Sequence, residues 1–416
     1  MDQDLINIIK RQKIQKESFL KSKFISRDQL KEKEELLKLG LIKIIIGPRR
    51  AGKSVFLLLL LQGIDFMYAN FDDDDLVKNI DNKNDFTDAL EQVYGKVNTI
   101  LFDEIQNLPN WDLYLNKLQR EGYNVFITGS NSNLLSTEFA SSLTGRYRTL
   151  EILPFSFLEY MKAINGTGNF DYFLKHGSFP ELIIKNLDLM PYIDDLISAI
   201  LYKDVTRRFL IKDPEKINLM IIYLISNCCN ILNYVNLGKA CDMSSFRTMK
   251  RYLGYIQNCY LFYFLSGFSF KTSNYLKSSK KIYVVDNGIL SYKNLFHSPN
   301  NGLFFENLVF TELIKRGYNP NSYLFYYKTK NNYEIDFVIK DIYKVGQLIQ
   351  VCFDISSKKT EEREIKALIQ ASDELKCDNL LIITVDTDKI EKVGDKTIKF
   401  ISFTEWAKSF DKNNKL

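Results

Sequence analysis

The sequence predicts an α/β fold in which the first 150 residues or so form a parallel β-sheet. Apolar segments of strand length lie within residues 41–47, 63–75, 97–111 and 123–135, and they alternate with stretches of helical periodicity. The first segment runs into a glycine-containing turn, and the third and fourth end in polar side chains. Because the carboxyl ends of parallel strands meet at one edge of a sheet, we expect the turn and the polar side chains to lie together.

The turn after the first segment has the spacing of a phosphate-binding loop, G-x-x-x-x-G-K-S. Its glycines let backbone N–H groups curl around phosphates, Lys53 reaches the β/γ oxygens, and the Ser54 hydroxyl serves Mg²⁺. A chance match in an ordinary strand–helix turn is the alternative, but a β-branched strand precedes the turn and an apolar helix follows it. ATP and Mg²⁺ are the expected ligands. The residues expected to contact them here are Gly47, Pro48, Arg49, Arg50, Ala51, Gly52, Lys53 and Ser54.

Two adjacent acids end the third segment. Asp103 is placed to hold Mg²⁺ through its water shell, and Glu104 is placed to polarise the attacking water. Neighbouring residues on a strand point to opposite faces, so two acids after three apolar residues are not an ordinary solvated face. The alternative is a strand that runs into an acidic loop. The fourth segment ends in Thr128, Ser130 and Asn131, which either bond the γ-phosphate or the attacking water, or form an ordinary turn.

These motifs, with "LTGRYRTLEILPFSFLEY" at residues 143–160, resemble the AAA+ class of P-loop ATPases, and more closely a branch of it common in archaea. The resemblance covers residues 40–160. It implies that Lys53 and Ser54 belong to Walker A, and that Asp103 and Glu104 form Walker B.

The resemblance also implies a sensor residue and an arginine finger. Asn131, or else Ser130, would sense the γ-phosphate. Arg146, with Arg148 as the alternative, would be donated to a neighbouring subunit, although an ordinary surface arginine is an equal possibility. A homo-oligomer, with a hexameric ring as one form, is therefore expected.

The sequence divides into four expected domains. Residues 1–160 form the ATPase core and residues 161–230 a helical lid, in which Arg207 and Arg208 either face nucleotide as a sensor 2 or, preferably, form a solvated or interfacial surface. Residues 231–295 are expected to form a winged helix. Residues 296–416 are expected to form an α/β restriction-endonuclease-like domain of the PD-(D/E)XK type.

The winged-helix prediction rests on a short helix at 235–241, a turn, a longer helix at 245–259 and two later strands. The longer helix would read the major groove of DNA and the strands would form the wing. The alternative is a docking module for a protein partner. The DNA-contact candidates are Arg247, Lys250 and Arg251 on the helix, and Lys277, Lys280 and Lys281, with Lys271, on the wing.

The last domain has the nuclease layout without its full set of residues. Glu306, Glu334 and Asp336 are in place, which allows one weak metal site, but a complete active centre is not visible. Gln350 and Cys352 stand where an acid and a lysine belong, and neither supplies the missing charge. A degenerate fold used for protein docking or nucleic-acid contact is therefore preferred over active cleavage.

The composition of the chain limits its expected partners and its expected location in the cell. The net charge of +5 is too mild to require a nucleic-acid partner, so that prediction rests on local clusters. The six cysteines form no CxxC pair, no apolar run is long enough to span a bilayer, and no signal peptide is evident, which predicts a cytoplasmic protein with no membrane partner. The leading hypothesis is an ATPase that couples hydrolysis to DNA binding or remodelling. The alternatives are a nucleotide-gated regulatory switch with a protein-docking C-terminal module, and an ATP-dependent nuclease.

Overall fold

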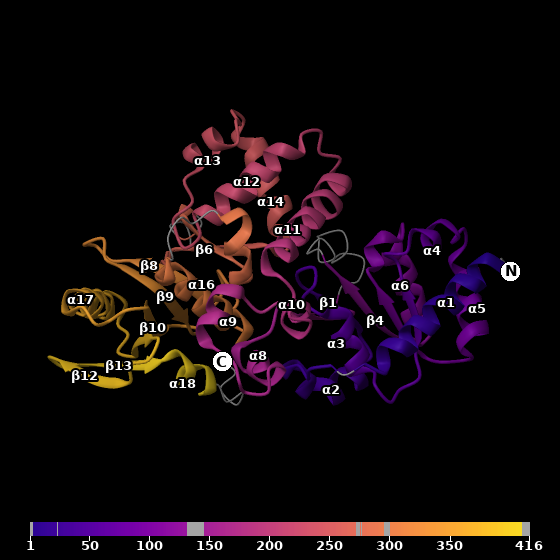
Figure 1. Ribbon diagram of the computed structural model, residues 1–416, viewed down its shortest axis with the longest axis horizontal. Helices are drawn as coiled ribbons and strands as arrows, with labels where there is room; N and C mark the ends of the chain where they lie inside the picture. Colours follow the sequence, from indigo (N-terminus) through magenta and orange to yellow (C-terminus); the bar gives the residue numbers. More distant parts are fainter. Residues whose placement is uncertain are drawn as a thin grey trace. The chain divides into compact units, whose positions relative to one another are not determined.

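The computed structural model describes residues 3–22, 24–130, 145–271, 275, 277–294 and 300–409 (Figure 1). It divides into two compact units. Unit 1 comprises Met1–Phe155 with Asn258–Tyr260, and unit 2 comprises Ser156–Gln257 with Leu261–Leu416. In the described ranges, no helix combines the length and the apolar character that a membrane crossing requires.

Unit 1 is built on a five-stranded parallel sheet with the order β2-β3-β4-β1-β5, as the sequence predicted for its first four strands. β1 is buried along its whole length, which is usual for a parallel sheet covered on both faces. The strands are β1 (Ile42–Ile46), β2 (Met67–Asn70), β3 (Thr99–Asp103), β4 (Asn124–Gly129) and β5 (Tyr147–Glu151).

Helices cover both faces of this sheet. Ile44 of β1 packs in one core with residues of α1, α5 and α6, whereas its neighbour Ile45 packs in a second core with α2 and α3, because successive strand residues point to opposite faces. The helices are α1 (Gln3–Leu20), η1 (Asp28–Glu32), α2 (Lys33–Lys38), α3 (Lys53–Leu60), α4 (Asp74–Lys78), α5 (Lys83–Tyr94), η2 (Ile105–Asn107) and α6 (Trp111–Arg120).

Unit 2 begins with a run of helices. The segment Ile200–Arg207 is a π-helix that continues α11. α13 and α14 reproduce the predicted short and long helices to within a residue. The elements are α8 (Phe157–Ala163), α9 (Phe170–His176), α10 (Pro180–Ile184), α11 (Leu189–Ala199), η4 (Ile200–Arg207), α12 (Pro214–Ser226), α13 (Tyr234–Ala240) and α14 (Phe246–Asn258).

The two strands expected to form a wing are part of the interior. β6 (Phe262–Ser266) and β7 (Lys280–Val284) pair antiparallel, and nearly every residue of both is buried. A bridge from Gly267 to Tyr326 and the stacking of Tyr283 on Phe310, with ring centroids 3.9 Å apart, join the pair to the C-terminal part of unit 2. The strand pair is therefore not an exposed DNA-facing wing.

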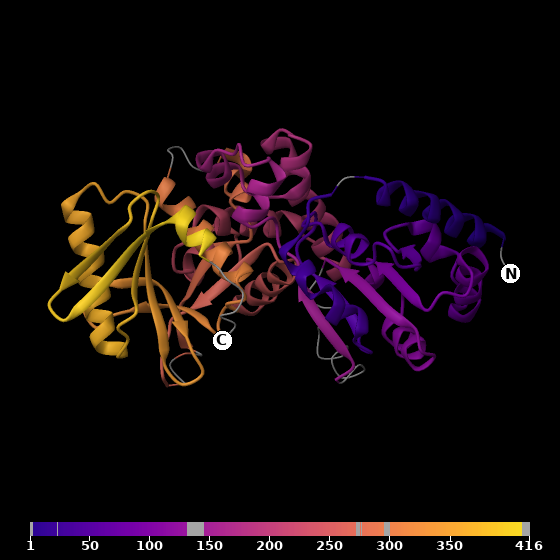
Figure 2. The same cartoon turned by 90° about the horizontal axis from the view of Figure 1, so that it is seen from below.

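The C-terminal part contains a six-stranded mixed sheet with the order β12-β13-β11-β10-β9-β8 (Figure 2). β8, β9 and β10 form an antiparallel meander, and β11 then joins β10 in parallel after helix α17. The elements are η5 (Asn287–Asn294), α16 (Asn301–Lys315), β8 (Leu324–Lys328), β9 (Glu334–Lys340), β10 (Val345–Cys352), α17 (Lys358–Leu375), β11 (Leu380–Thr384), β12 (Lys389–Val393), β13 (Lys396–Ser402) and α18 (Phe403–Lys408).

Candidate functional site

The loop between β1 and α3 depends on two glycines. Gly47 has φ +139°, and a Cβ at this position would lie 2.1 Å from the carbonyl oxygen of Ile152. Gly52 has φ +90° and caps the N-terminus of α3 in the left-handed region. Any other L-residue at Gly47 would be strained and would also clash with backbone, so this position requires glycine.

Lys53, the first residue of α3, directs its ammonium group into the loop. The side chain is buried, and Nζ donates hydrogen bonds to the carbonyl oxygens of Gly47 at 3.1 Å and Pro48 at 3.0 Å. A buried ammonium group that is held by neutral carbonyls has strong affinity for an anion that can reach it. The loop is thus shaped for phosphate.

Ser54 and Asp103 meet at the carboxyl edge of the sheet. The Ser54 hydroxyl donates to Asp103 Oδ1 over 2.9 Å, and the Thr128 hydroxyl donates to the same oxygen. The strand order explains this convergence, because β4, which carries Thr128, lies between β1 and β3. A hydroxyl and a carboxylate are the hard oxygen ligands that Mg²⁺ takes together with phosphate oxygens and water, so these side chains fit Mg²⁺.

Glu104 follows Asp103 in an unusual backbone conformation. Its φ of +51° lies in the left-handed region, which is uncommon for a residue other than glycine and is concentrated at functional sites. The Glu104 N–H donates to the Thr128 hydroxyl over 2.9 Å. Its carboxylate accepts hydrogen bonds from Ser130 Oγ at 3.1 Å and from Gln106 Nε2.

The two adjacent acids have pKa values shifted in opposite directions. Burial, reinforced by the negative charge of Glu104, raises the pKa of Asp103 above its ordinary value. Burial also acts to raise the pKa of Glu104, but the positive charge of Lys53 and the hydrogen bond from Gln106 leave it below its ordinary value. At neutral pH Glu104 is therefore ionised and able to accept a proton.

Arg27 is a site residue that the sequence did not reveal. It precedes η1, is buried, and donates from Nη1 to the carbonyl oxygen of Ala51 over 3.0 Å and from Nη2 to that of Leu153 over 2.5 Å. It thereby ties the phosphate-binding loop to the chain that follows β5. No motif marks an arginine so far before the loop, because its role depends on the folded path of the chain.

The other candidates near this site are placed as follows. Asn131 lies outside the described residues. Arg146 and Arg148 are exposed at the start of β5, which is an edge strand of the sheet. Arg207, exposed, and Arg208, half-buried, belong to unit 2.

The helix expected to contact DNA presents its basic residues to solvent. Arg247, Lys250 and Arg251 are all exposed, while Met249, Leu253 and Ile256 bury the opposite face of α14. Of the predicted wing residues, Lys277 and Lys271 are exposed. Lys280 is half-buried and donates to Ser266 Oγ over 2.5 Å, so its ammonium is already engaged by a neighbouring strand.

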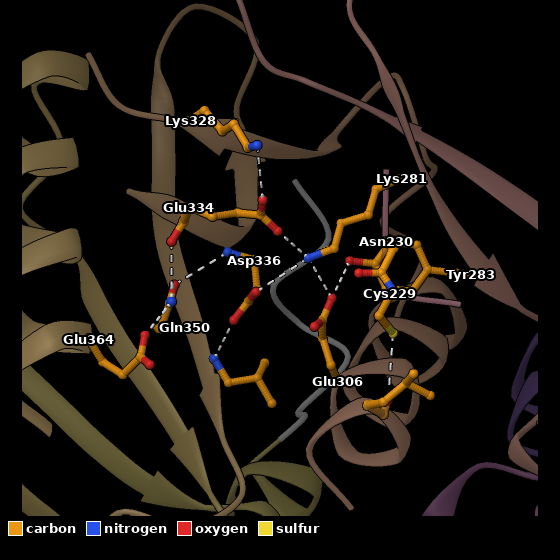
Figure 3. A network of polar contacts seen from close by, with 12 residues as sticks. Cys229, Asn230, Lys281, Tyr283, Glu306, Lys328, Glu334, Asp336, Gln350 and Glu364 are labelled. Atoms are coloured by element: carbon orange, nitrogen blue, oxygen red, sulfur yellow. Dashed lines mark hydrogen bonds and ion pairs between the residues drawn. The ribbon is translucent and has the colours of Figure 1, made fainter. Parts of the chain in front are cut away.

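Lys281 is not a DNA contact, and that prediction was wrong. Its side chain is 2% exposed, and Nζ lies 2.8 Å from Glu306 Oε1, 2.6 Å from Glu334 Oε1 and 3.5 Å from Asp336 Oδ1 (Figure 3). The Lys281 ammonium group occupies the space between the three acids to which a weak metal site was assigned. Among the residues that the structure describes, no group of three or more His, Cys, Asp or Glu side chains is arranged to hold a metal ion.

Residues 40–161 match a family described as an AAA domain. Residues 167–299 and 301–406 match two families described as domains of unknown function, DUF8612 and DUF4143. Among solved structures, similarity is found to the Walker-type ATPase PABY2304 of Pyrococcus abyssi, with 15% identity, a TM-score of 0.43, and 64% of this chain and 95% of that chain covered. Similarity is also found to the replication initiator DnaA bound to AMPPCP and single-stranded DNA, with 16% identity, a TM-score of 0.31, and 56% of this chain and 90% of that chain covered.

Two curated proteins are similar along most of their length. The uncharacterized protein MJ1544 of Methanocaldococcus jannaschii is 38% identical over 403 residues, which cover 89% of this chain and 88% of MJ1544. An uncharacterized protein of Haemophilus influenzae is 30% identical over 351 residues, which cover 77% of this chain and 84% of the relative. The chain therefore belongs to the family of these two proteins, and its first domain is a P-loop ATPase domain of the AAA type.

Proposed function

We propose that the chain binds ATP with Mg²⁺ and hydrolyses it at the carboxyl edge of the five-stranded sheet. The observation that carries this proposal is the 2.9 Å hydrogen bond from Ser54 Oγ to Asp103 Oδ1. It joins the start of α3, directly after the loop, to the end of β3, where the second acid, Glu104, follows. The loop, the hydroxyl and both acids are thus assembled at one edge of the sheet, where open α/β sheets bind their ligands.

Each side chain has a role that follows from its contacts. Lys53 exchanges the carbonyl oxygens of Gly47 and Pro48 for phosphate oxygens, with the backbone N–H groups of the loop around them. Ser54 and Asp103 hold Mg²⁺, which when bound neutralises charge on the phosphate oxygens. Glu104, ionised and fixed by Ser130 and Gln106, accepts the proton of the attacking water.

Two further residues complete the proposal. Asn131 follows Ser130 directly and is assigned the sensing of the γ-phosphate. Arg146 is exposed directly before the edge strand β5, where it can reach the nucleotide of a neighbouring copy and stabilise charge on the transferring phosphoryl group. Hydrolysis then requires a homo-oligomer, and the turnover per subunit rises with protein concentration.

We propose DNA as the partner of helix α14. Residues 246–258 contain three basic side chains and no acid, and all three basic groups lie on the exposed face. The helix follows α13 after a short turn, so its N-terminal half is free to enter a major groove as in a helix-turn-helix. Lys250 Nζ lies 4.7 Å from the ring centroid of the exposed Phe246, which places the ammonium group beside an aromatic ring near the start of the helix.

Steady-state ATP hydrolysis tests both parts of this proposal, the ATPase activity and the contact of α14 with DNA. Hydrolysis is measured without DNA and with single-stranded, duplex or branched DNA, using Glu104→Gln as the blank. We expect Lys53→Ala to abolish nucleotide binding, and we expect one form of DNA to stimulate hydrolysis several-fold. Hydrolysis that survives Glu104→Gln unchanged would refute the assigned base.

The proposed contact between α14 and DNA is tested with alanine variants and a matched control. Arg247→Ala/Lys250→Ala/Arg251→Ala should abolish stimulation and DNA binding while leaving DNA-free hydrolysis intact. Lys358→Ala/Lys359→Ala on α17 removes comparably exposed lysines from another surface and should change neither. If every form of DNA leaves hydrolysis and binding unchanged, α14 is not a DNA-contact surface and the ATPase proposal stands alone.

A further inference from the structure

The charge cluster around Lys281 is assembled from several elements that are far apart in the sequence. Lys281 comes from β7, Glu306 from α16, and Glu334 and Asp336 from β9 (Figure 3). An ammonium group has three N–H donors, and here each of three carboxylates lies within 3.5 Å of Nζ. Lys281 is thus fully engaged by these acids and has no capacity left for a ligand.

The three carboxylates also contact groups other than Lys281. Glu306 Oε1 accepts from the Tyr283 hydroxyl over 2.7 Å, and Asp336 Oδ2 accepts from the Val351 N–H over 2.9 Å. Glu334 Oε2 lies 3.8 Å from Nζ of Lys328, which is exposed at the rim. The acids therefore converge on the position of the Lys281 ammonium, which is buried, rather than spreading toward solvent.

Gln350 closes the side of the cluster on which the nuclease layout requires a third metal-binding acid. Its Oε1 accepts from the Asp336 N–H over 3.3 Å, and its Nε2 donates to the carbonyl oxygen of Glu334 over 3.2 Å and to Glu364. Both polar atoms of the amide are used to hold β9 and α17. Gln350 is consequently a structural tie and not a substitute ligand.

The lysine carries its charge permanently in this setting. Burial acts to lower the pKa of Lys281, but Glu306, Asp336 and Glu334 together raise it well above its ordinary value. Burial and the charge of Glu306 raise the pKa of Asp336 well above its ordinary value, which reduces the excess of negative charge. Lys281 is thus charged beside these acids at neutral pH.

We propose that the Lys281 ammonium is a built-in cation that takes the place of a divalent metal in a nuclease-like centre. The C-terminal sheet then folds around its acids without any metal, and the cluster binds no divalent cation and cleaves no phosphodiester. This inference is independent of the ATPase proposal, and it opposes the ATP-dependent nuclease alternative. It also explains why β7 belongs to the C-terminal core and not to a wing.

Thermal unfolding of the Lys281→Ala variant tests whether the Lys281 ammonium takes the place of a divalent metal ion. With EDTA, the loss of the central cation leaves the carboxylates unpaired, and the melting temperature of unit 2 should fall by about 10 °C. Mn²⁺ at millimolar concentration should restore most of this loss, whereas parent protein should melt equally with EDTA and with Mn²⁺. Lys328→Ala is the matched control, because it removes a lysine that contacts the same Glu334 from the rim, and it should show no response to Mn²⁺.

Metal binding is measured directly in protein whose nucleotide site is disabled by Ser54→Ala/Asp103→Asn. Electron paramagnetic resonance of free Mn²⁺ should detect no binding in this background, and adding Lys281→Ala should increase Mn²⁺ affinity by about 100-fold or more. A further Glu306→Gln substitution should remove the gained site.

Three results would overturn the proposal. The first is binding of Mn²⁺ by the protein that retains Lys281, if Glu306→Gln abolishes that binding. This measurement does not need the Lys281→Ala variant, so it is informative even if that variant does not fold. The second is a Lys281→Ala protein that melts like the parent, or one that is destabilised but does not respond to Mn²⁺. The third is metal-dependent nicking of plasmid DNA by the parent chain that is lost in Glu306→Gln, which would make Lys281 part of an active nuclease centre.

Discussion

Thr128 joins the two adjacent acids of the ATPase site through a single hydroxyl group. The hydroxyl donates to Asp103 Oδ1 and accepts from the backbone N–H of Glu104 over 2.9 Å. The first bond orients the carboxylate that faces Ser54. The second holds Glu104 in its left-handed backbone conformation, so both acids depend on one side chain of β4.

Thr128→Val should therefore slow ATP turnover more than it weakens nucleotide binding. The substitution keeps the shape but leaves a buried N–H and a carboxylate oxygen without this partner, which costs about 1–3 kcal/mol and corresponds to roughly 10-fold or more in kcat. The dissociation constant for ADP should change by less than about two-fold, because the loop and Lys53 are untouched. Thr128→Ser retains the hydroxyl and should recover most of the turnover. A valine variant with parental kcat would show that Glu104 does not need this bond.

Gly47→Ala should destabilise unit 1 and abolish nucleotide binding. The new Cβ would lie 2.1 Å from the backbone carbonyl oxygen of Ile152, and the φ of +139° is unfavourable for alanine. Relief requires moving β5 or the loop, at a cost of about 3 kcal/mol or more. Gly40→Ala is the matched control, since no atom lies within 4 Å of its added Cβ. Urea unfolding with and without ADP separates the two variants, and equal midpoints for both would contradict the close approach of Ile152.

The raised pKa of Asp103 should make the stability of unit 1 fall as the pH rises. The native carboxyl keeps its proton to higher pH than the unfolded one, so its contribution is complete below the ordinary aspartate pKa and is lost as the pH rises through the raised value. Asp103→Asn cannot ionise and can still accept from Ser54 and Thr128. The variant should therefore be at least as stable as the parent at pH 7. Its stability should also lack the decrease with rising pH that the Asp103 carboxyl causes in the parent.

The same substitution should remove activity, which separates the catalytic role of Asp103 from any structural one. Mg²⁺ requires the ionised carboxylate, so Mg·ADP affinity of the parent should rise with pH across the window above the ordinary aspartate pKa. In Asp103→Asn this rise should be absent and kcat should fall by about 100-fold or more. Melting curves and Mg·ADP titrations over a pH series measure both effects. A variant that is less stable than the parent at every pH would mean that the charge of Asp103 supports the fold.

The sequence predicted that the candidate ATPase-site residues converge at one edge of the sheet, because their positions follow local rules. Ser54 follows a strand and a glycine turn, Asp103 ends a strand, and parallel strands bring such ends together. The contacts of Thr128 depend on β4 lying between β1 and β3, which no local pattern specifies. The sequence could therefore indicate a polar strand end, but not that its hydroxyl joins the two acids.

Lys281 shows where sequence patterns fail. It stands in "KSSKK", which has the composition of a solvated loop, and Lys277 in the same stretch is indeed exposed. Lys281 is surrounded by carboxylates at residues 306, 334 and 336, which come from elements that approach its side chain only in the folded chain. A buried charge is favourable only when such partners are present, so the environment of Lys281 cannot be inferred from the residues adjacent to it in the sequence.

Arg27 offers a test of how the loop is held from outside. Its guanidinium donates to the carbonyl oxygens of Ala51 and Leu153, and lies 5.2 Å from the ring centroid of Phe155. Arg27→Met keeps much of the apolar stem but removes the donors, leaving two buried carbonyl groups without this partner. Since the loop N–H groups must be pre-arranged to surround phosphate, the variant should bind ADP roughly 10-fold more weakly.

The control for Arg27 is another arginine of the same unit. Arg11 pairs with Asp73 at 2.8 Å, but its side chain is half exposed and distant in sequence from the loop, so Arg11→Met should leave ADP affinity unchanged. Calorimetric titration of ADP into both variants, with melting temperatures recorded alongside, distinguishes a positioning role from a purely structural one. A positioning role predicts that saturating ADP restores less stability to Arg27→Met than to the parent, because binding and loop geometry are linked. If Arg27→Met melts at a lower temperature yet binds ADP as the parent does, the guanidinium stabilises unit 1 without shaping the loop.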